Sequence, residues 1–303
     1  MRENVCSSNY EESPRRPRSV KREDADLNLA IDDICQILDK VRFQKPLIHH
    51  ITNYVTVNDC ANMVLAIGAS PIMADDINEV EDITSISSAL VLNIGTLNQR
   101  TIESMITAGK KANAIGIPVI FDPVGAGASQ LRSETTEKII DQVKVAVLRG
   151  NMSEIGFVAG LDSKTKGVDV SETDKNMSLA SAVQIANKAA KKLECIVAVT
   201  GATDVITDGR GTVFVENGNK HLSNVTGTGC MCTSLVASFC GASGPGDLFS
   251  GCVGGICAMG ICGEMAYENA GTFGYGSFHM AIIDAASKLT SETMARRAKI
   301  SEA

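Results

Sequence analysis

The sequence predicts a three-layer α/β/α fold built on a mainly parallel central sheet. Short, largely apolar runs recur along the chain, at 71–74, 89–95, 118–122, 145–150 and 195–201. Stretches with the apolar spacing of helices separate these runs, and the clearest are 98–116 and 178–193. Buried strands that alternate with helices are typical of βαβ units, in which helices cover both faces of a parallel sheet.

Helices are also expected before and after this alternating region. The stretches 27–42 and 58–68 have helical apolar spacing and precede or interrupt the first strands. The run 248–263 is the most apolar part of the chain. It is short for a membrane span, which needs about 20 apolar residues, so we expect a buried helix. The segment 288–303 is expected to be a last helix, and whether it packs or frays stays open.

The chain is expected to form a single folded domain over residues 26–303. Its 303 residues are near the upper size for one hydrophobic core. Residues 1–25 are polar, contain proline and carry mixed charge. Such a segment cannot bury enough apolar surface to offset the entropy of ordering, so a disordered tail is expected. Its basic residues leave a targeting or docking signal open as an alternative.

Charge and cysteine content restrict the partners and sites of this protein. The net charge of -7 and the pI near 5.2 argue against nucleic acid or a membrane surface as a partner. The ten cysteines form no CxxC pair and no zinc-type spacing. The N-terminal residues lack the apolar run of a secretory signal. Reduced thiols in a cytoplasmic protein are therefore expected.

A glycine-containing turn before an apolar helix is the most informative segment. It is NVTGTGCMCTSLVASF at 224–239, with the helix expected to begin near Cys230. Free backbone N–H groups at a helix start, aided by the helix dipole, can bind a phosphate. A tight turn with Thr226 or Thr228 as N-cap is the structural alternative. Cys230 in the first turn would have a lowered thiol pKa and could take a proton from a substrate hydroxyl.

Five motifs in order give the chain a resemblance to a known family. They are HHITNYVTVNDCAN, FDPVGAG, RGNMSEI, VTGATD and NVTGTGCMCT, and the match runs from about Lys45 to Lys288. The chain resembles hydroxyethylthiazole kinases of thiamine salvage. The resemblance implies a ribokinase-like fold and a homotrimer with active sites between neighbouring subunits. It also implies transfer of the ATP γ-phosphate to the hydroxyethyl group of 4-methyl-5-(2-hydroxyethyl)thiazole.

The resemblance assigns metal and nucleotide roles to residues that follow predicted strands, where ligands bind in such sheets. Asp122 and Glu154 match the residues that act on Mg²⁺, directly or through water. Arg149, Thr200 and Gly201 match the ATP site. Each assignment has a structural alternative: Asp122 could form a turn with Pro123, Glu154 could be a favourable charge in a first helical turn, and Arg149 could pair with either acid.

Substrate and catalytic roles also follow from the resemblance. Met73, Asn53 and Gly227 match the thiazole site. The turn residues Gly227, Thr228 and Gly229 would stabilise developing charge while Cys230 assists deprotonation, at the position where related sugar kinases have an aspartate.

Three polar residues near these positions keep two interpretations each. Of His49 and His50, at most one is expected to face the pocket. Asn151 could orient the waters of the metal or cap the following helix.

Other activities remain possible on these residues. A nucleotide-dependent hydratase-type lyase would share the nucleotide site, and a kinase could act on another small alcohol such as hydroxymethylpyrimidine. A binding protein without turnover is the non-enzymatic alternative. A requirement for a monovalent cation stays open.

Overall fold

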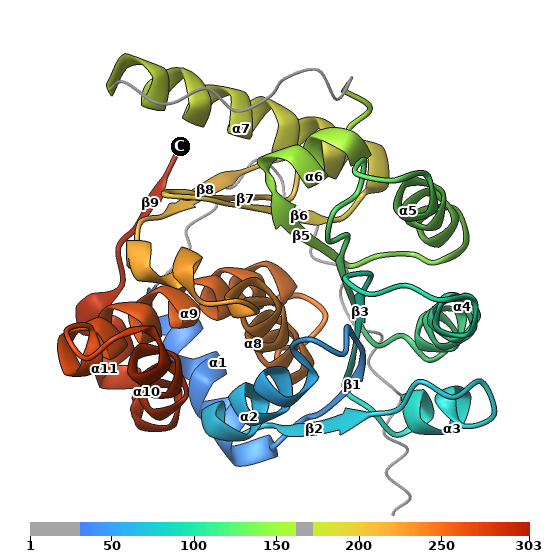
Figure 1. The fold of residues 1–303 in the computed structure, drawn as a ribbon, viewed down its shortest axis with the longest axis horizontal. Coiled ribbons are helices and arrows are strands. Elements are labelled where there is room, and N and C mark those ends of the chain that lie inside the picture. Colours follow the sequence, from blue (N-terminus) through green and yellow to red (C-terminus); the bar gives the residue numbers. More distant parts are fainter. Residues whose placement is uncertain (1–30, 162–171) are drawn as a thin grey trace, which may run out of the picture.

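The protein folds as a central sheet between two layers of helices (Figure 1). The computed structural model describes residues 31–161 and 172–303. The predicted tail, residues 1–25, lies outside the described residues. Within them the predicted α/β/α architecture is confirmed.

The sheet has nine strands in the order β2-β1-β3-β4-β5-β6-β7-β8-β9. The first six strands in this order pair in parallel, and β7, β8 and β9 continue the sheet as antiparallel strands. The sheet is thus mainly parallel, as predicted. The strands are β1 Leu47–Ile51, β2 Ser70–Met73, β3 Ala89–Asn93, β4 Val119–Asp122, β5 Val147–Asn151, β6 Ile196–Thr200, β7 Asp204–Thr207, β8 Thr212–Val215 and β9 Ile300–Glu302.

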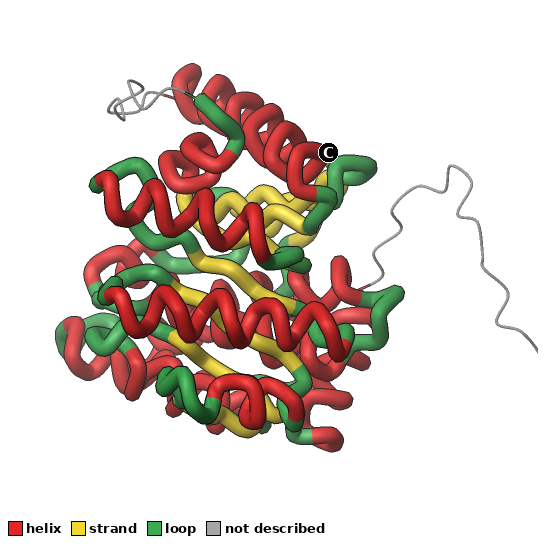
Figure 2. The backbone as a smooth tube through the Cα atoms, turned by 90° about the vertical axis from the view of Figure 1, so that its right-hand side faces the viewer, coloured by secondary structure: helices red, strands yellow, loops and turns green. Residues whose placement is uncertain are grey.

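Two groups of helices cover the two faces of the sheet, each over its own apolar core. One face carries α3 Val80–Ser85, α4 Gln99–Ile115, α5 Gln130–Gln142, α6 Met152–Val158 and α7 Glu172–Leu193. The other face carries α1 Ile31–Gln44, α2 Val57–Ile67, α8 Thr228–Ala242, α9 Leu248–Ala270, α10 Tyr275–Lys288 and α11 Ser291–Arg297. Viewed from the side of α3, α4 and α5, the helices lie in front of the strands and cover this face of the sheet (Figure 2).

Helices α8 and α9 form the centre of the second face, where they pack against each other. Helix α9 has 23 residues and is 72% buried over its most apolar window. It is long and apolar enough to span a membrane. The predicted helix, 248–263, was therefore too short, because α9 continues to Ala270. The expected burial is confirmed, because α9 lies between α8, α10 and the sheet.

The carboxyl-terminal segment differs from the prediction. Helix α11 ends at Arg297, and residues 300–302 form strand β9 beside β8. Asn217 holds this segment in place, since its side chain donates to Arg297 O at 2.8 Å and accepts from Lys299 N at 2.8 Å. The segment therefore packs, but only its first part is helical.

Candidate functional site

A cavity of about 420 Å³ lies at the carboxyl edge of the parallel strands. The loops that follow β1, β3, β4, β5 and β6 contribute to it, together with the first turn of α8. Its lining residues are Asn53, Val55, Thr56, Gly95, Asp122, Val124, Arg149, Asn151, Glu154, Thr200, Thr226, Gly227, Gly229 and Cys230. The predicted metal residues, two of the three predicted ATP residues and the predicted catalytic cysteine thus share one cavity.

The start of α8 forms one wall of this cavity. The helix begins at Thr228, two residues earlier than expected, and its N-cap is Gly227 with φ of +86°. This left-handed conformation suits glycine. The threonine cap considered above was wrong, because Thr228 Oγ1 instead donates to Leu222 O at 2.9 Å. Within the described residues, the backbone N–H groups of 227–230 have no protein acceptor.

Asp122 ends β4 and is fully buried. Its Oδ2 accepts hydrogen bonds from Thr233 Oγ1 at 2.7 Å and Asn93 Nδ2 at 3.0 Å. Its Oδ1 has no hydrogen-bond partner among the described residues. Burial raises the pKa of Asp122 to about 6, against the opposing effect of the Arg149 guanidinium, whose Nη1 lies 3.8 Å from Oδ2. One carboxylate oxygen is thus left for a ligand.

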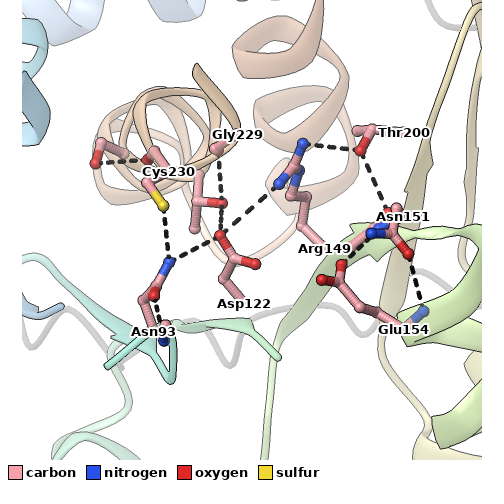
Figure 3. Close-up of polar contacts among 12 residues, drawn as sticks. Asn93, Asp122, Arg149, Asn151, Glu154, Thr200, Gly229 and Cys230 are labelled. Carbon is pink, nitrogen blue, oxygen red and sulfur yellow. Dashed lines mark hydrogen bonds and ion pairs between the residues drawn. The ribbon is translucent and has the colours of Figure 1, made fainter. Parts of the chain in front are cut away.

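Arg149 lies on β5 beside Asp122 (Figure 3). Its Nη2 donates to Thr200 Oγ1 at 2.8 Å. A Cβ atom at Gly229 would lie 2.9 Å from Arg149 Nη1, so the missing side chain there lets the guanidinium lie against the first turn of the helix. Arg149 pairs with Asp122 as the structural alternative proposed, yet its side chain also lines the cavity.

Glu154 joins two loops at the edge of the cavity. Its Oε2 accepts from Asn151 N and its Oε1 from Gly125 N, each at 2.8 Å. The Asn151 side chain accepts in turn from the backbone N–H of Ser153 and Glu154, which completes a capping box. The capping role of Asn151 is therefore confirmed, and the Glu154 carboxylate fixes the loops after β4 and β5.

Two asparagine amides hold the sulfur of Cys230. Asn53 Nδ2 lies 3.2 Å and Asn93 Nδ2 3.3 Å from Sγ. These bonds lower the pKa of the Cys230 thiol, but burial and then the Asp122 charge outweigh them and raise it above its ordinary value. The expected lowering of this pKa by the helix dipole was wrong.

Among the residues that the sequence analysis missed, two hold the walls of the cavity together. Asn93 lies inside the apolar run 89–95 but ends strand β3, so the rule that selected Asp122, a polar residue at a strand end, finds it once the strand is known to end there. The Arg132 guanidinium donates to the carbonyl oxygens of Ile94, Gly95 and Val124. It thereby ties together the loops after β3 and β4, and no sequence pattern signals this role.

Several predicted site residues lie away from the cavity. Met73 ends the edge strand β2, and β1 separates it from β3. Gly201 is exposed, and its N–H donates to Asp204 Oδ1 at 2.9 Å. His49 and His50 are buried in β1, where burial lowers the pKa of both, that of His50 to about 4. Neither histidine lines the cavity.

This fold and this site are those of an α/β phosphotransferase. The model of the Hydroxyethylthiazole kinase family matches residues 38–292. The chain belongs to the hydroxyethylthiazole kinase family. A hydroxyethylthiazole kinase of Clostridium beijerinckii is 62% identical over 269 residues, which cover 89% of this chain and 97% of that protein.

Solved structures agree with this family. The hydroxyethylthiazole kinase of Pyrococcus horikoshii OT3 superimposes with a TM-score of 0.80 at 36% identity, covering 90% of this chain and 99% of that chain. A ribokinase-like superfamily protein of Enterococcus faecalis gives a TM-score of 0.57 at 10% identity, covering 86% and 95%. The predicted ribokinase-like fold is confirmed.

Proposed function

We propose that this chain transfers the γ-phosphate of ATP to the hydroxyethyl group of 4-methyl-5-(2-hydroxyethyl)thiazole. Membership of the hydroxyethylthiazole kinase family supports this reaction. The observation that carries it is the start of α8, where the backbone N–H groups of 227–230 have no acceptor within the described residues. Three of these residues, Gly227, Gly229 and Cys230, line the same cavity as Asp122 and Arg149. Such a helix start stabilises the charge of a migrating phosphoryl group.

Phosphoryl transfer depends on alignment and on charge stabilisation more than on covalent chemistry. The amides of Gly227, Thr228 and Gly229 bind the phosphoryl oxygens in this proposal. Arg149 adds a guanidinium that can donate to two anionic oxygens at once. Thr200 holds this guanidinium through its Oγ1. Gly201, which follows Thr200, is exposed outside the lining of the cavity.

The acidic residues suit Mg²⁺. This ion keeps several waters and takes one or two carboxylates together with substrate phosphates. Two residues offer such a set: Asp122 Oδ1 is buried with no hydrogen-bond partner in the part of the chain that the structure describes, and Glu154 lines the same cavity. The described residues contain no group of three or more acidic, histidine or cysteine ligands that would form a full protein cage. Mg²⁺ held by Asp122 and Glu154 would offset the negative charge of the ATP phosphates.

Cys230 assists with the proton of the alcohol. Its raised pKa keeps most of the thiol protonated near neutral pH, so only a small thiolate fraction can accept this proton. The amides at the helix start therefore supply most of the stabilisation, and Cys230 adds a contribution that grows with pH.

The proposed assembly is a cytoplasmic homotrimer with active sites between subunits. Val55 lines the cavity with 56% of its surface exposed, and the adjacent Tyr54 is 79% exposed. A neighbouring subunit would cover these apolar side chains. It would also bring its own Met73 to the thiazole beside Asn53 and Gly227, which explains why Met73 is remote from the cavity of its own chain.

An ADP-release assay tests the reaction. The purified protein is incubated with ATP and either the thiazole alcohol or hydroxymethylpyrimidine, with and without Mg²⁺, and the phosphate ester is identified by mass spectrometry. We expect ester and ADP in equal amounts with the thiazole and Mg²⁺ only. Faster turnover of the pyrimidine alcohol would contradict the substrate, and ADP without any ester would contradict a kinase.

A further inference from the structure

Asn93 is the most completely bonded polar side chain beside the reacting groups. It is 1% exposed. Its Nδ2 donates to Asp122 Oδ2 at 3.0 Å and to Cys230 Sγ at 3.3 Å. Its Oδ1 accepts from Asn53 Nδ2 at 3.0 Å and from Gly95 N at 2.9 Å. All four hydrogen-bonding positions of the amide are therefore in use.

These partners fix the orientation of the amide. A flipped Asn93 would place its oxygen against the Asp122 carboxylate and its NH₂ group against the N–H of Gly95, and both contacts are repulsive. The parallel register contributes as well, because it pairs Asn93 directly with Asp122 on the neighbouring strand. Strand pairing and hydrogen bonding thus require the same orientation.

The amide connects two groups that the reaction uses for different purposes. Asp122 belongs to the proposed metal site, whereas Cys230 lies at the helix start that binds the phosphoryl group. Asn93 and Thr233 both donate to Asp122 Oδ2, whereas Oδ1 has no hydrogen-bond partner among residues 31–161 and 172–303. The second N–H of the Asn93 amide donates to the Cys230 sulfur and favours a negative charge on it.

We infer that Asn93 is a positioning residue for phosphoryl transfer, which holds the Cys230 sulfur and the Asp122 carboxylate in a fixed mutual arrangement through its two N–H donors. It touches neither substrate nor metal in this role. The inference rests on the proposed kinase activity for its kinetic consequence, and on the geometry of the protein alone for its effect on the thiol.

The thiol can be followed without substrate or metal. Among the nine described cysteines, only Cys230 is not buried, so iodoacetamide labelling mapped by mass spectrometry reports on it. The pH midpoint of labelling gives the thiolate population. Asn93→Ala, Asn93→Ser and Asn93→Asp are compared with wild type. Asn93→Asp keeps the shape of the side chain and removes both N–H donors, so it stays informative if the alanine variant does not fold.

Asn217→Ala is the matched control. Asn217 is also buried, at 5% exposure, and its side chain is bonded to Glu264, Arg297 and Lys299 in a separate network. Its loss reports the general cost of removing a fully bonded asparagine. We expect the control to lower the melting temperature without moving the labelling midpoint of Cys230.

In Asn93→Ala we expect the labelling midpoint to rise by about one pH unit, because the thiolate loses one donor. In Asn93→Asp the labelling midpoint of Cys230 should rise further, because the new carboxylate places a negative charge beside the sulfur. The kcat of both variants falls about 10- to 100-fold, while KM for ATP changes by less than about threefold. An unmoved midpoint in Asn93→Ala and Asn93→Asp, or a kcat of Asn93→Asp within about twofold of wild type, overturns the inference. Absence of ester formation by wild type would instead contradict the proposed function.

Discussion

Two residues of the helix start show how single atoms shape this site. Gly229 has no side chain, and that space is filled by the Arg149 guanidinium, whose Nη1 lies 2.9 Å from where a Cβ would be. Cys230 has a sulfur that is held by two amides yet has a raised pKa. The first feature concerns nucleotide binding and the second concerns the pH dependence of turnover.

Substituting Gly229 by alanine is expected to weaken ATP binding. The new methyl group would push aside the end of a flexible side chain, so the fold is kept while the guanidinium leaves the phosphate path. We expect KM for ATP to rise about tenfold in Gly229→Ala, with a melting temperature close to that of wild type. Gly276→Ala is the control, since Gly276 is also the second residue of a helix and a Cβ there meets no atom within 4 Å. Equal KM values in the two variants would contradict the role of this contact.

The pH dependence of kcat is expected to depend on Cys230. Because the pKa of this thiol is raised above its ordinary value, its thiolate fraction increases steadily as the pH rises from 7 towards 9. The kcat of wild type should increase over this range, but only by about tenfold or less, because the amides at the helix start supply most of the stabilisation. Cys230→Ser lacks a group that ionises in this range and should give a flat profile at lower kcat. A rising profile in Cys230→Ser would assign the pH dependence to another group.

At the scale of helices and strands, most of the fold could be predicted from the sequence. Most of the strands β2 to β6 are short, continuous apolar runs, because both faces of a parallel strand are buried. Such runs can be recognised from the local sequence alone. Strand β1 was missed because two histidines interrupt its apolar pattern, and the fold provides their partners. The antiparallel strands β7 and β8 are four residues each, too short to give a period.

The candidate site was predictable only in part. The family resemblance assigned roles to Asp122, Arg149, Glu154 and Thr200, and their places at or after predicted strand ends supported the assignment, although Arg149 lies in the middle of β5. The direction of the pKa shift at Cys230 could not be found, since it depends on how much water the tertiary packing excludes and on the distance to Asp122. Local sequence contains neither quantity.

The contact of α8 with α9 gives a prediction at this scale. A Cβ at Gly255 would lie 2.5 Å from Cα of Val236, and backbone atoms cannot yield as a side chain can. We expect Gly255→Ala to lower the free energy of unfolding by about 1–3 kcal/mol, measured by denaturant titration. Gly156→Ala is the matched control, because Gly156 is a buried glycine of helix α6 and a Cβ there meets no atom within 4 Å. Similar stabilities of the two variants would show that α8 and α9 can separate at little cost.

At the scale of the whole molecule, one chain leaves its predicted substrate site incomplete. Asn53 and Gly227 line the cavity, whereas Met73 lies at the edge strand of the sheet. The proposed trimer resolves this difference only if Met73 of one subunit enters the cavity of its neighbour. Light scattering during size-exclusion chromatography gives the number of subunits, but only an activity measurement shows whether a site is shared.

Mixing two variants, each with a lowered kcat, tests the shared site. Cys230→Ala removes the sulfur from a subunit's own cavity, and Met73→Arg is expected to block the cavity that Met73 serves. If that cavity belongs to a neighbour, an intact site forms where a Met73→Arg subunit lies next to a Cys230→Ala subunit. The Met73→Arg subunit provides a cavity with Cys230, and the Cys230→Ala subunit provides Met73. Random equimolar trimers should then recover about a quarter of the wild-type kcat after co-refolding. If Met73 served its own chain, every subunit would carry a defective site, and mixing would not raise kcat above the values of the two variants measured separately.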